Sequence, residues 1–96
     1  MNRKKAIVTG AGTGIGQGVA IALAKAGYDV AVHYHSSAEG AEQTVREIER
    51  CGARGYAIRA DLSEKEQIDR LFSQALEQLG GLDLFVNNSG VTMKTE

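Results

Sequence analysis

The chain has 96 residues, of which 43% are hydrophobic, and its formal net charge is −1. A chain of this length forms one small domain, and its near-neutral, interspersed charge argues against a nucleic acid or a membrane surface as the partner. A single cysteine, Cys51, excludes an internal disulfide and a cysteine zinc site.

The first predicted element is a strand over residues 6–8, behind a basic N-terminus. Three apolar residues are too few for the core of a signal peptide, so we expect a cytoplasmic protein. Residues 9–16, TGAGTGIG, follow as a glycine turn and lead into a helix-like stretch over 19–24. A strand, a glycine turn and a helix start in this order predict an anion site, because backbone N–H groups and the helix dipole converge there. The glycines leave room for a pyrophosphate, although their spacing, GxxxGxG, is weak evidence alone.

Three further short apolar runs predict strands over residues 30–32, 56–58 and 84–86. Helical patterns separate the runs, and glycines near the ends of these patterns suit helix termini. The last two helices each begin with a capping-box pattern, a serine followed three residues later by a glutamate. The pairs are Ser36 with Glu39 and Ser63 with Glu66, and the helices end near Gly27, Gly52 and residues 80–81. The apolar faces comprise Ala38, Ala41, Val45 and Ile48 in the second helix and Ile68, Leu71, Phe72, Ala75, Leu76 and Leu79 in the third.

The order βαβαβαβ predicts the α/β class, with parallel strands joined by right-handed crossovers. We expect the N-terminal half of a Rossmann-type doubly wound parallel sheet with strand order 3-2-1-4. The fourth strand is then an apolar edge with nothing to cover it, which natural domains usually avoid. No linker is visible, so residues 1–96 are interpreted as half of a single dinucleotide-binding domain.

Polar or glycine-bearing segments follow all four predicted strands. They are the glycine turn, residues 33–36, the pair Asp61-Leu62, and the segment 87–90. Ligands of open parallel sheets bind outside the carboxyl ends of the strands, near the point where the strand order reverses. Four such ends predict one ligand site.

Together these residues resemble the short-chain dehydrogenase/reductase family. The match consists of TGxxxGIG at residues 9–16, Asp61-Leu62 after the third strand, and the NNAG signature as Asn87-Asn88-Ser89-Gly90, with serine in place of the usual alanine. The resemblance covers essentially the whole chain. It implies a nicotinamide-dependent oxidoreductase that transfers hydride to or from a small carbonyl or alcohol substrate, and a homo-oligomeric full-length protein. Residues 30–34 are similar to 3-oxoacyl-carrier-protein reductases and glucose 1-dehydrogenases.

The resemblance also implies roles for single residues. It places the pyrophosphate on Gly10, Thr13, Gly14, Ile15 and Gly16, the adenine on Asp61 and Leu62, and the adenosine ribose on Asn88, Ser89 and Gly90. Two purely structural alternatives remain open. An aspartate before a helix is often only a cap, and an Asn-Asn pair is often only a turn, with a packing role favoured for Asn87.

Cofactor choice depends on the end of the second strand. A carboxylate there would bind the ribose 2′-hydroxyl of NAD and repel the 2′-phosphate of NADP, but Tyr34 occupies the position. Asp29, at the other end of the strand, cannot substitute. No Arg or Lys stands at Thr13 or within residues 33–37, so His35 and Ser36 are the candidate phosphate contacts. We therefore favour NADP(H), with NAD(H) as the alternative. His33 and His35 share a strand face but lack a third ligand, and no metal site is predicted.

The family's catalytic tyrosine and lysine form a YxxxK motif, which is absent here. The residues four positions after Tyr28, Tyr34 and Tyr56 are Val32, Ala38 and Ala60. The resemblance places the catalytic residues beyond Glu96, so residues 1–96 alone are expected to be inactive. A non-catalytic nucleotide-binding module, or a truncated product that pairs with another chain, is the alternative. A methyltransferase is disfavoured because it would need an acid where Tyr34 stands.

Overall fold

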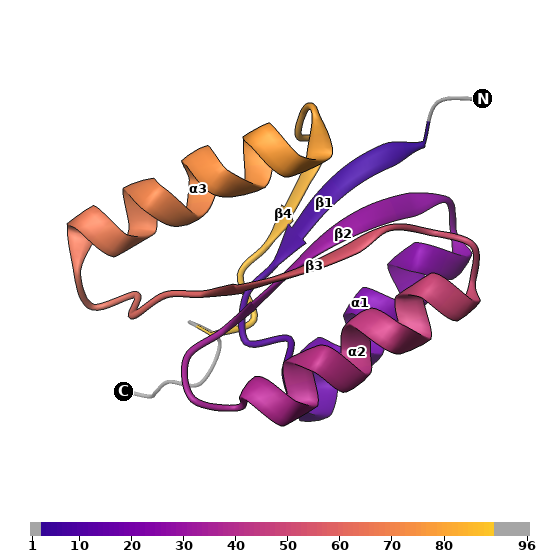
Figure 1. Cartoon of the computed structure of the whole chain (residues 1–96), viewed down its shortest axis with the longest axis horizontal. Helices are drawn as coiled ribbons and strands as arrows, with labels where there is room; N and C mark the ends of the chain where they lie inside the picture. The colour runs from indigo at the N-terminus through magenta and orange to yellow at the C-terminus, as the bar shows by residue number, and fades with distance from the viewer. Residues whose placement is uncertain (1–2, 90–96) are drawn as a thin grey trace.

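Four strands and three helices alternate along the chain in the computed structural model, which describes residues 3–89 (Figure 1). The strands are β1 (Lys4–Val8), β2 (Tyr28–Tyr34), β3 (Gly55–Arg59) and β4 (Leu84–Val86). The helices are α1 (Gly14–Lys25), α2 (Ala38–Arg50) and α3 (Lys65–Leu79). Every predicted strand is present, and three of them extend beyond the apolar run that indicated them.

The strands form one parallel sheet in the order β3-β2-β1-β4. Ala6 in β1 pairs with Val30 on one side and with Leu84 on the other, and Tyr34 pairs with Arg59. The predicted fold class and strand order are confirmed. Because all four strands are parallel, their carboxyl ends meet at one edge of the sheet, here called the carboxyl edge.

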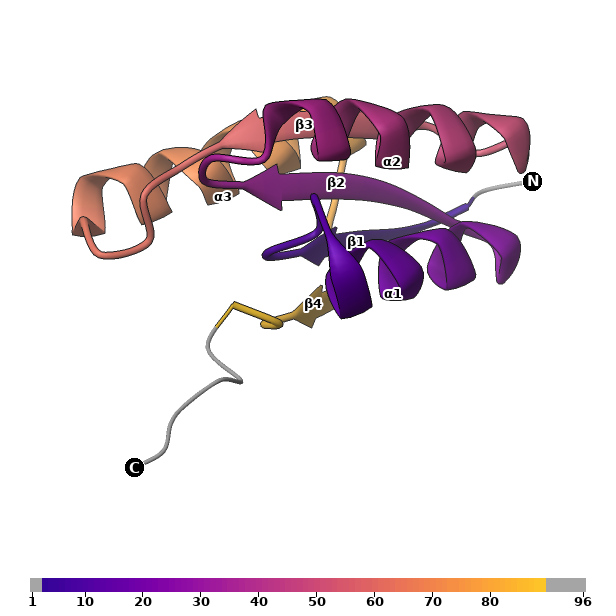
Figure 2. The ribbon, with the colours of Figure 1, turned by 90° about the horizontal axis from the view of Figure 1, so that it is seen from below.

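Helices cover both faces of the sheet. Figures 1 and 2 show α1 and α2 together on one face and α3 on the other. The residues of β1 that lie between these layers, Ala6, Ile7 and Val8, are fully buried. A strand covered on both faces must be apolar along its length, which explains the continuous run that predicted it.

The predicted capping boxes are wrong, whereas the predicted glycine ends are right. The caps of α2 and α3 are Ser37 and Glu64, and neither makes a side-chain capping hydrogen bond. Ser63 is not available as a cap, because its N–H and hydroxyl both donate to the carboxylate of Asp61. Glycines with left-handed backbone follow all three helices, at Gly27, Gly52 and Gly80.

The apolar stripes are right in period but not at every position. On α2, Ala38 is exposed, and Thr44 is fully buried where no apolar residue was expected. On α3, Leu71, Ala75 and Leu79 are buried, but Leu76 is 44% exposed. Phe85 of β4 is 42% exposed and stacks at a tilt on Phe72, with ring centroids 5.2 Å apart. Among residues 3–89, β4 has a strand on one side only.

Candidate functional site

Two different reasons favour glycine at the three positions of the predicted motif, Gly10, Gly14 and Gly16. Gly10 has φ of 63° and Gly14 has φ of 57°, in the left-handed region that a side chain disfavours. A Cβ on Gly16 would overlap the carbonyl oxygen of Gly10 and crowd the amide of Asn88. The glycine turn can therefore fold back tightly against the start of α1 only with these residues.

The ends of β2 and β4 hold this turn in place. The N–H of Gly10 donates to Nδ1 of His33 over 3.0 Å, and the N–H of Ala11 donates to the carbonyl of His33 over 2.9 Å. From the other side, Nδ2 of Asn88 donates to the carbonyl of Gly10 over 3.2 Å. The backbone of the turn is thus bonded to the strands on both sides of β1.

Helix α2 holds the turn from a third direction. The hydroxyl of Thr44 lies 2.9 Å from the carbonyl of Ala11 and 2.8 Å from that of Gly40, and it accepts a hydrogen bond from Gln17 over 2.8 Å. A Cβ on Gly40 would overlap the carbonyl oxygen of Gly12, so the two backbones are in direct contact.

The N-terminus of α1 opens toward solvent at the carboxyl edge. Its cap, Thr13, makes no side-chain hydrogen bond, and its first turn has no acidic residue. The first N–H groups of a helix have no partner within the helix, so they are available to an anion. Thr13 and Gly14 are exposed, and Ile15 is 79% exposed.

The segment after β4 returns to β1. The hydroxyl of Thr9 donates to Oδ1 of Asn87 over 3.1 Å and accepts from the N–H of Ser89 over 3.0 Å. Asn87 is exposed, and its packing role stays a prediction. Ser89 and Asn88 lie beside the glycine turn, and Gly90 lies outside the described residues.

The ends of β2 and β3 meet beside the same edge. Oδ1 of Asp61 accepts the N–H of Ser63 over 3.0 Å and its hydroxyl over 2.7 Å, and these bonds hold the pKa of Asp61 below its usual value. Nε2 of His35 lies 4.0 Å from Oδ2 of Asp61. Nε of Arg59 donates to the carbonyl of His35 over 3.1 Å.

The other predicted contacts, Tyr34, Leu62 and Ser36, border this edge. Tyr34 is half-buried and packs against the core on the side of α1 and α2, whereas Leu62 packs against the core on the side of α3. Ser36 is exposed.

Sequence reasoning missed three contributors to the site: His33, Thr44 and Arg59. His33 and Thr44 bond to backbone atoms of the glycine turn, so no complementary side chain signals them. Arg59 belongs to β3, and only its register beside Tyr34 brings it to the end of β2. That register follows from the predicted parallel pairing, which could have identified Arg59.

Other classes of site find no support in residues 3–89. This part of the chain contains no group of three His, Cys, Asp or Glu side chains placed to hold a metal ion. Its helices also include none that is both long and apolar enough to cross a membrane.

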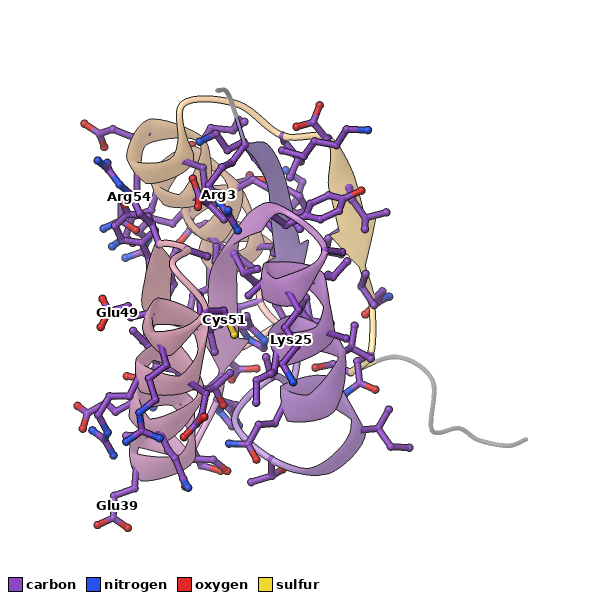
Figure 3. All side chains as sticks on the ribbon, turned by 90° about the vertical axis from the view of Figure 1, so that its right-hand side faces the viewer. Arg3, Lys25, Glu39, Glu49, Cys51 and Arg54 are labelled. Carbon is purple, nitrogen blue, oxygen red and sulfur yellow. The ribbon has the colours of Figure 1, made fainter. Side chains whose placement is uncertain are left out.

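The opposite end of the sheet has a pocket of about 710 Å³, in which the carboxylate of Asp29 is paired with two cations. Arg3 and Lys5 both contact the carboxylate of Asp29 at 2.9 Å, and the N–H of Arg54 donates to the same carboxylate. Figure 3 shows Arg3 and Arg54 at this end, far from Glu39 at the start of α2. This pocket is separate from the carboxyl edge.

Comparison with known proteins agrees with the geometry. The model of the short chain dehydrogenase family matches residues 4–96. A hydroxynaphthalene reductase-like protein of Metarhizium guizhouense is 48% identical over 87 residues, which are 91% of this chain and 33% of that protein. The 3-oxoacyl-(acyl-carrier-protein) reductase of Staphylococcus aureus is 43% identical over 89 residues, 93% of this chain and 36% of that protein.

Solved structures give the same result. An acetoin dehydrogenase from Enterobacter cloacae superposes with a TM-score of 0.87 at 41% identity, covering 99% of this chain and 37% of that one. A 7α-hydroxysteroid dehydrogenase complexed with NADH and 7-oxo glycochenodeoxycholic acid gives a TM-score of 0.83 at 39% identity, covering 88% and 32%. The chain spans about a third of the length of these relatives.

Proposed function

The chain belongs to the short-chain dehydrogenase family, and on that premise we propose that its carboxyl edge binds the ADP half of a nicotinamide dinucleotide. The observation that carries this proposal is the glycine turn, which is fixed by β2, β4 and α2 while the N-terminus of α1 stays open. A fixed array of N–H donors binds a pyrophosphate without reorganising.

Each strand end has a part in this proposal. The pyrophosphate lies on Gly10, Thr13, Gly14, Ile15 and Gly16, the adenine on Asp61 and Leu62, and the ribose beside Asn88, Ser89 and Gly90. The hydrogen bonds from Ser63 keep Asp61 ionised, so its carboxylate is an acceptor for the exocyclic amine of adenine.

We favour NADP(H) over NAD(H), because the end of β2 has no carboxylate and a cation lies beside it. Tyr34 occupies the acidic position, and His35 and Ser36 follow it. Arg59 extends from β3 and is fixed by its bond to the carbonyl of His35, so its guanidinium stands in for the Arg or Lys that residues 33–37 lack. A guanidinium is well suited to a 2′-phosphate.

The activity proposed for the whole protein is hydride transfer between the nicotinamide and a small carbonyl or alcohol substrate, in a homo-oligomer. Residues 1–96 bind and orient the cofactor in this scheme and supply no catalytic tyrosine and lysine pair. Incubating these residues alone with NADPH and a carbonyl substrate is expected to give no turnover, and measurable NADPH oxidation would contradict this division of labour.

Calorimetry with two small nucleotides tests the binding proposal. We expect 2′,5′-ADP to bind more tightly than 5′-ADP. The Arg59→Gln variant should bind 2′,5′-ADP about tenfold more weakly, because it loses a charge-assisted contact, and should bind 5′-ADP unchanged. Arg54→Gln, an exposed arginine at the opposite end of the sheet, is the matched control and should change neither affinity.

The outcomes separate the parts of the proposal. If neither nucleotide binds, the proposal that the carboxyl edge binds a nucleotide is wrong. If 5′-ADP binds as tightly as 2′,5′-ADP, the site stands and the preference for NADP(H) is wrong.

A further inference from the structure

We propose that His33 is a positioning residue that fixes the distance between the glycine turn and the segment Ala60-Asp61. It does so only as the neutral Nε2–H tautomer. The inference rests on the proposed function, because it concerns the same nucleotide site. His33 is the penultimate residue of β2, and its side chain is 2% exposed between Gly10 and Ala60.

The two ring nitrogens of His33 have different, fixed roles. Nδ1 lies 3.0 Å from the backbone nitrogen of Gly10 and accepts a hydrogen bond from its N–H, so Nδ1 carries a lone pair and no proton. Nε2 lies 2.9 Å from the carbonyl of Ala60, which can only accept, so Nε2 carries the proton. Because each nitrogen has a backbone partner of one kind, a charged ring does not fit this arrangement.

These partners belong to different parts of the nucleotide site. Gly10 is the first glycine of the turn assigned to the pyrophosphate, and Ala60 directly precedes Asp61, which is assigned to the adenine. The carbonyl of His33 also accepts a hydrogen bond from the N–H of Ala11, so His33 makes two hydrogen bonds to the glycine turn. The separation between the two subsites therefore depends on this ring.

The surroundings of His33 favour the neutral ring. Burial lowers the pKa of His33, the carbonyl of Ala60 opposes this effect, and the charge of His35 lowers the pKa further. Asp61 and Arg59 both lie against His35. The glycine turn has no titratable side chain, Asn87 and Asn88 contribute amides, and the charged side chains of α3 are exposed. Protonation of Nδ1 would set two N–H donors against each other and release Gly10.

The affinity for ADP-ribose as a function of pH tests the inference. This probe has no terminal phosphate, whose second pKa near 6 would confuse the profile. We expect the dissociation constant to rise once the pH falls below the lowered pKa of His33, by at most about tenfold per pH unit. In the His33→Asn variant, affinity at about pH 8 should fall about three- to tenfold and its pH dependence should flatten, because the amide does not titrate. His35→Asn keeps the ring of His33, so the pH dependence should persist, displaced to higher pH because the charge of His35 no longer lowers the pKa of His33.

Nitrogen NMR of the wild-type ring provides a test that does not depend on a variant folding. It should report a protonated Nε2 and an unprotonated Nδ1 at about pH 8. The Nδ1–H tautomer, a charged ring at that pH, or an affinity that does not change with pH would overturn the inference. If ADP-ribose does not bind even at about pH 8, the proposed function fails instead.

Discussion

Gly16 and Gly18 lie on the same helix, two residues apart, but their surroundings differ. A Cβ on Gly16 would overlap the carbonyl oxygen of Gly10, whereas a Cβ on Gly18 meets no atom within 4 Å. Only the first glycine is therefore required by packing. Gly18 makes no such contact, and the backbone freedom that a glycine loses on folding destabilises a helix interior.

We predict opposite effects for alanine at these two positions. Gly16→Ala should lower the free energy of unfolding by about 1–3 kcal/mol, because backbone must move to admit the methyl group, and it should weaken ADP-ribose binding. Gly18→Ala should raise the free energy of unfolding by about 0.5–1 kcal/mol and leave binding unchanged. Urea unfolding and calorimetry measure both quantities, and equal effects of the two variants would contradict this account of the turn.

Residue-level prediction from sequence succeeded where backbone geometry restricts the residue type. Gly10, Gly14 and Gly16 are recognisable because left-handed backbone at the first two and close packing at the third favour glycine. For His33 the sequence indicates only membership of the polar segment 33–36 and a possible metal role beside His35, because its actual partners are backbone atoms, which any sequence provides. Arg59 was overlooked because its neighbour at the site, His35, lies 24 positions earlier in the chain.

At the scale of elements, Asp29 joins three strands at the end of the sheet opposite the site. Its carboxylate, 4% exposed, contacts Arg3 before β1, Lys5 in β1 and the N–H of Arg54 before β3. Burial raises the pKa of Asp29, but the hydrogen bonds from Arg54, Lys5 and Arg3 outweigh it, and the pKa lies below its usual value.

Removing this carboxylate is predicted to destabilise the fold without affecting the site. Asp29→Asn should lower the free energy of unfolding by about 2–3 kcal/mol at neutral pH, less than for a fully buried ion pair because Arg3 and Lys5 are partly exposed. Asp69→Asn, which removes an exposed pair with Lys65, should change it by about 0.5 kcal/mol at most. Affinity for ADP-ribose at about pH 8 should be unchanged in both variants.

The sign of the pH effect follows from the lowered pKa of Asp29. The unfolded chain binds a proton at this carboxyl before the folded protein does, so the stabilisation is complete above about pH 4–5 and is lost as the pH falls through the folded pKa. Urea unfolding from neutral to acid pH should show a shallower loss of stability in Asp29→Asn than in the wild type. Identical slopes would mean that the carboxylate does not stabilise the folded sheet.

Element order could be predicted from the sequence, but helix starts could not. Periodic apolar runs and terminal glycines reflect requirements of burial and of left-handed backbone, which hold in any context. A serine followed by a glutamate is only an option for capping. The N–H and the hydroxyl of Ser63 both donate to the carboxylate of Asp61, so Ser63 does not cap the helix and α3 begins at Lys65.

For the molecule as a whole, parallel strands are the reason that one edge collects the functional residues. The predicted order β3-β2-β1-β4 places the ends of β2 and β4 on either side of β1, and the structure bonds both to the glycine turn. The sequence could not identify the substrate, because the roles proposed for residues 3–89 all concern the nucleotide. The pocket of about 710 Å³ could not be foreseen either, since residues from β1, β2, the end of α3 and the adjoining loops line it together.

The central claim, that the carboxyl edge binds the ADP half of a dinucleotide, is tested most directly by following backbone amide NMR signals during titration with ADP-ribose. The account predicts the largest changes at Gly14, Ile15 and Gly16, with further changes at Asp61 and Ser89 and none at Asp29. Saturable changes centred on Asp29 and Arg54, at the opposite end of the sheet, would contradict it.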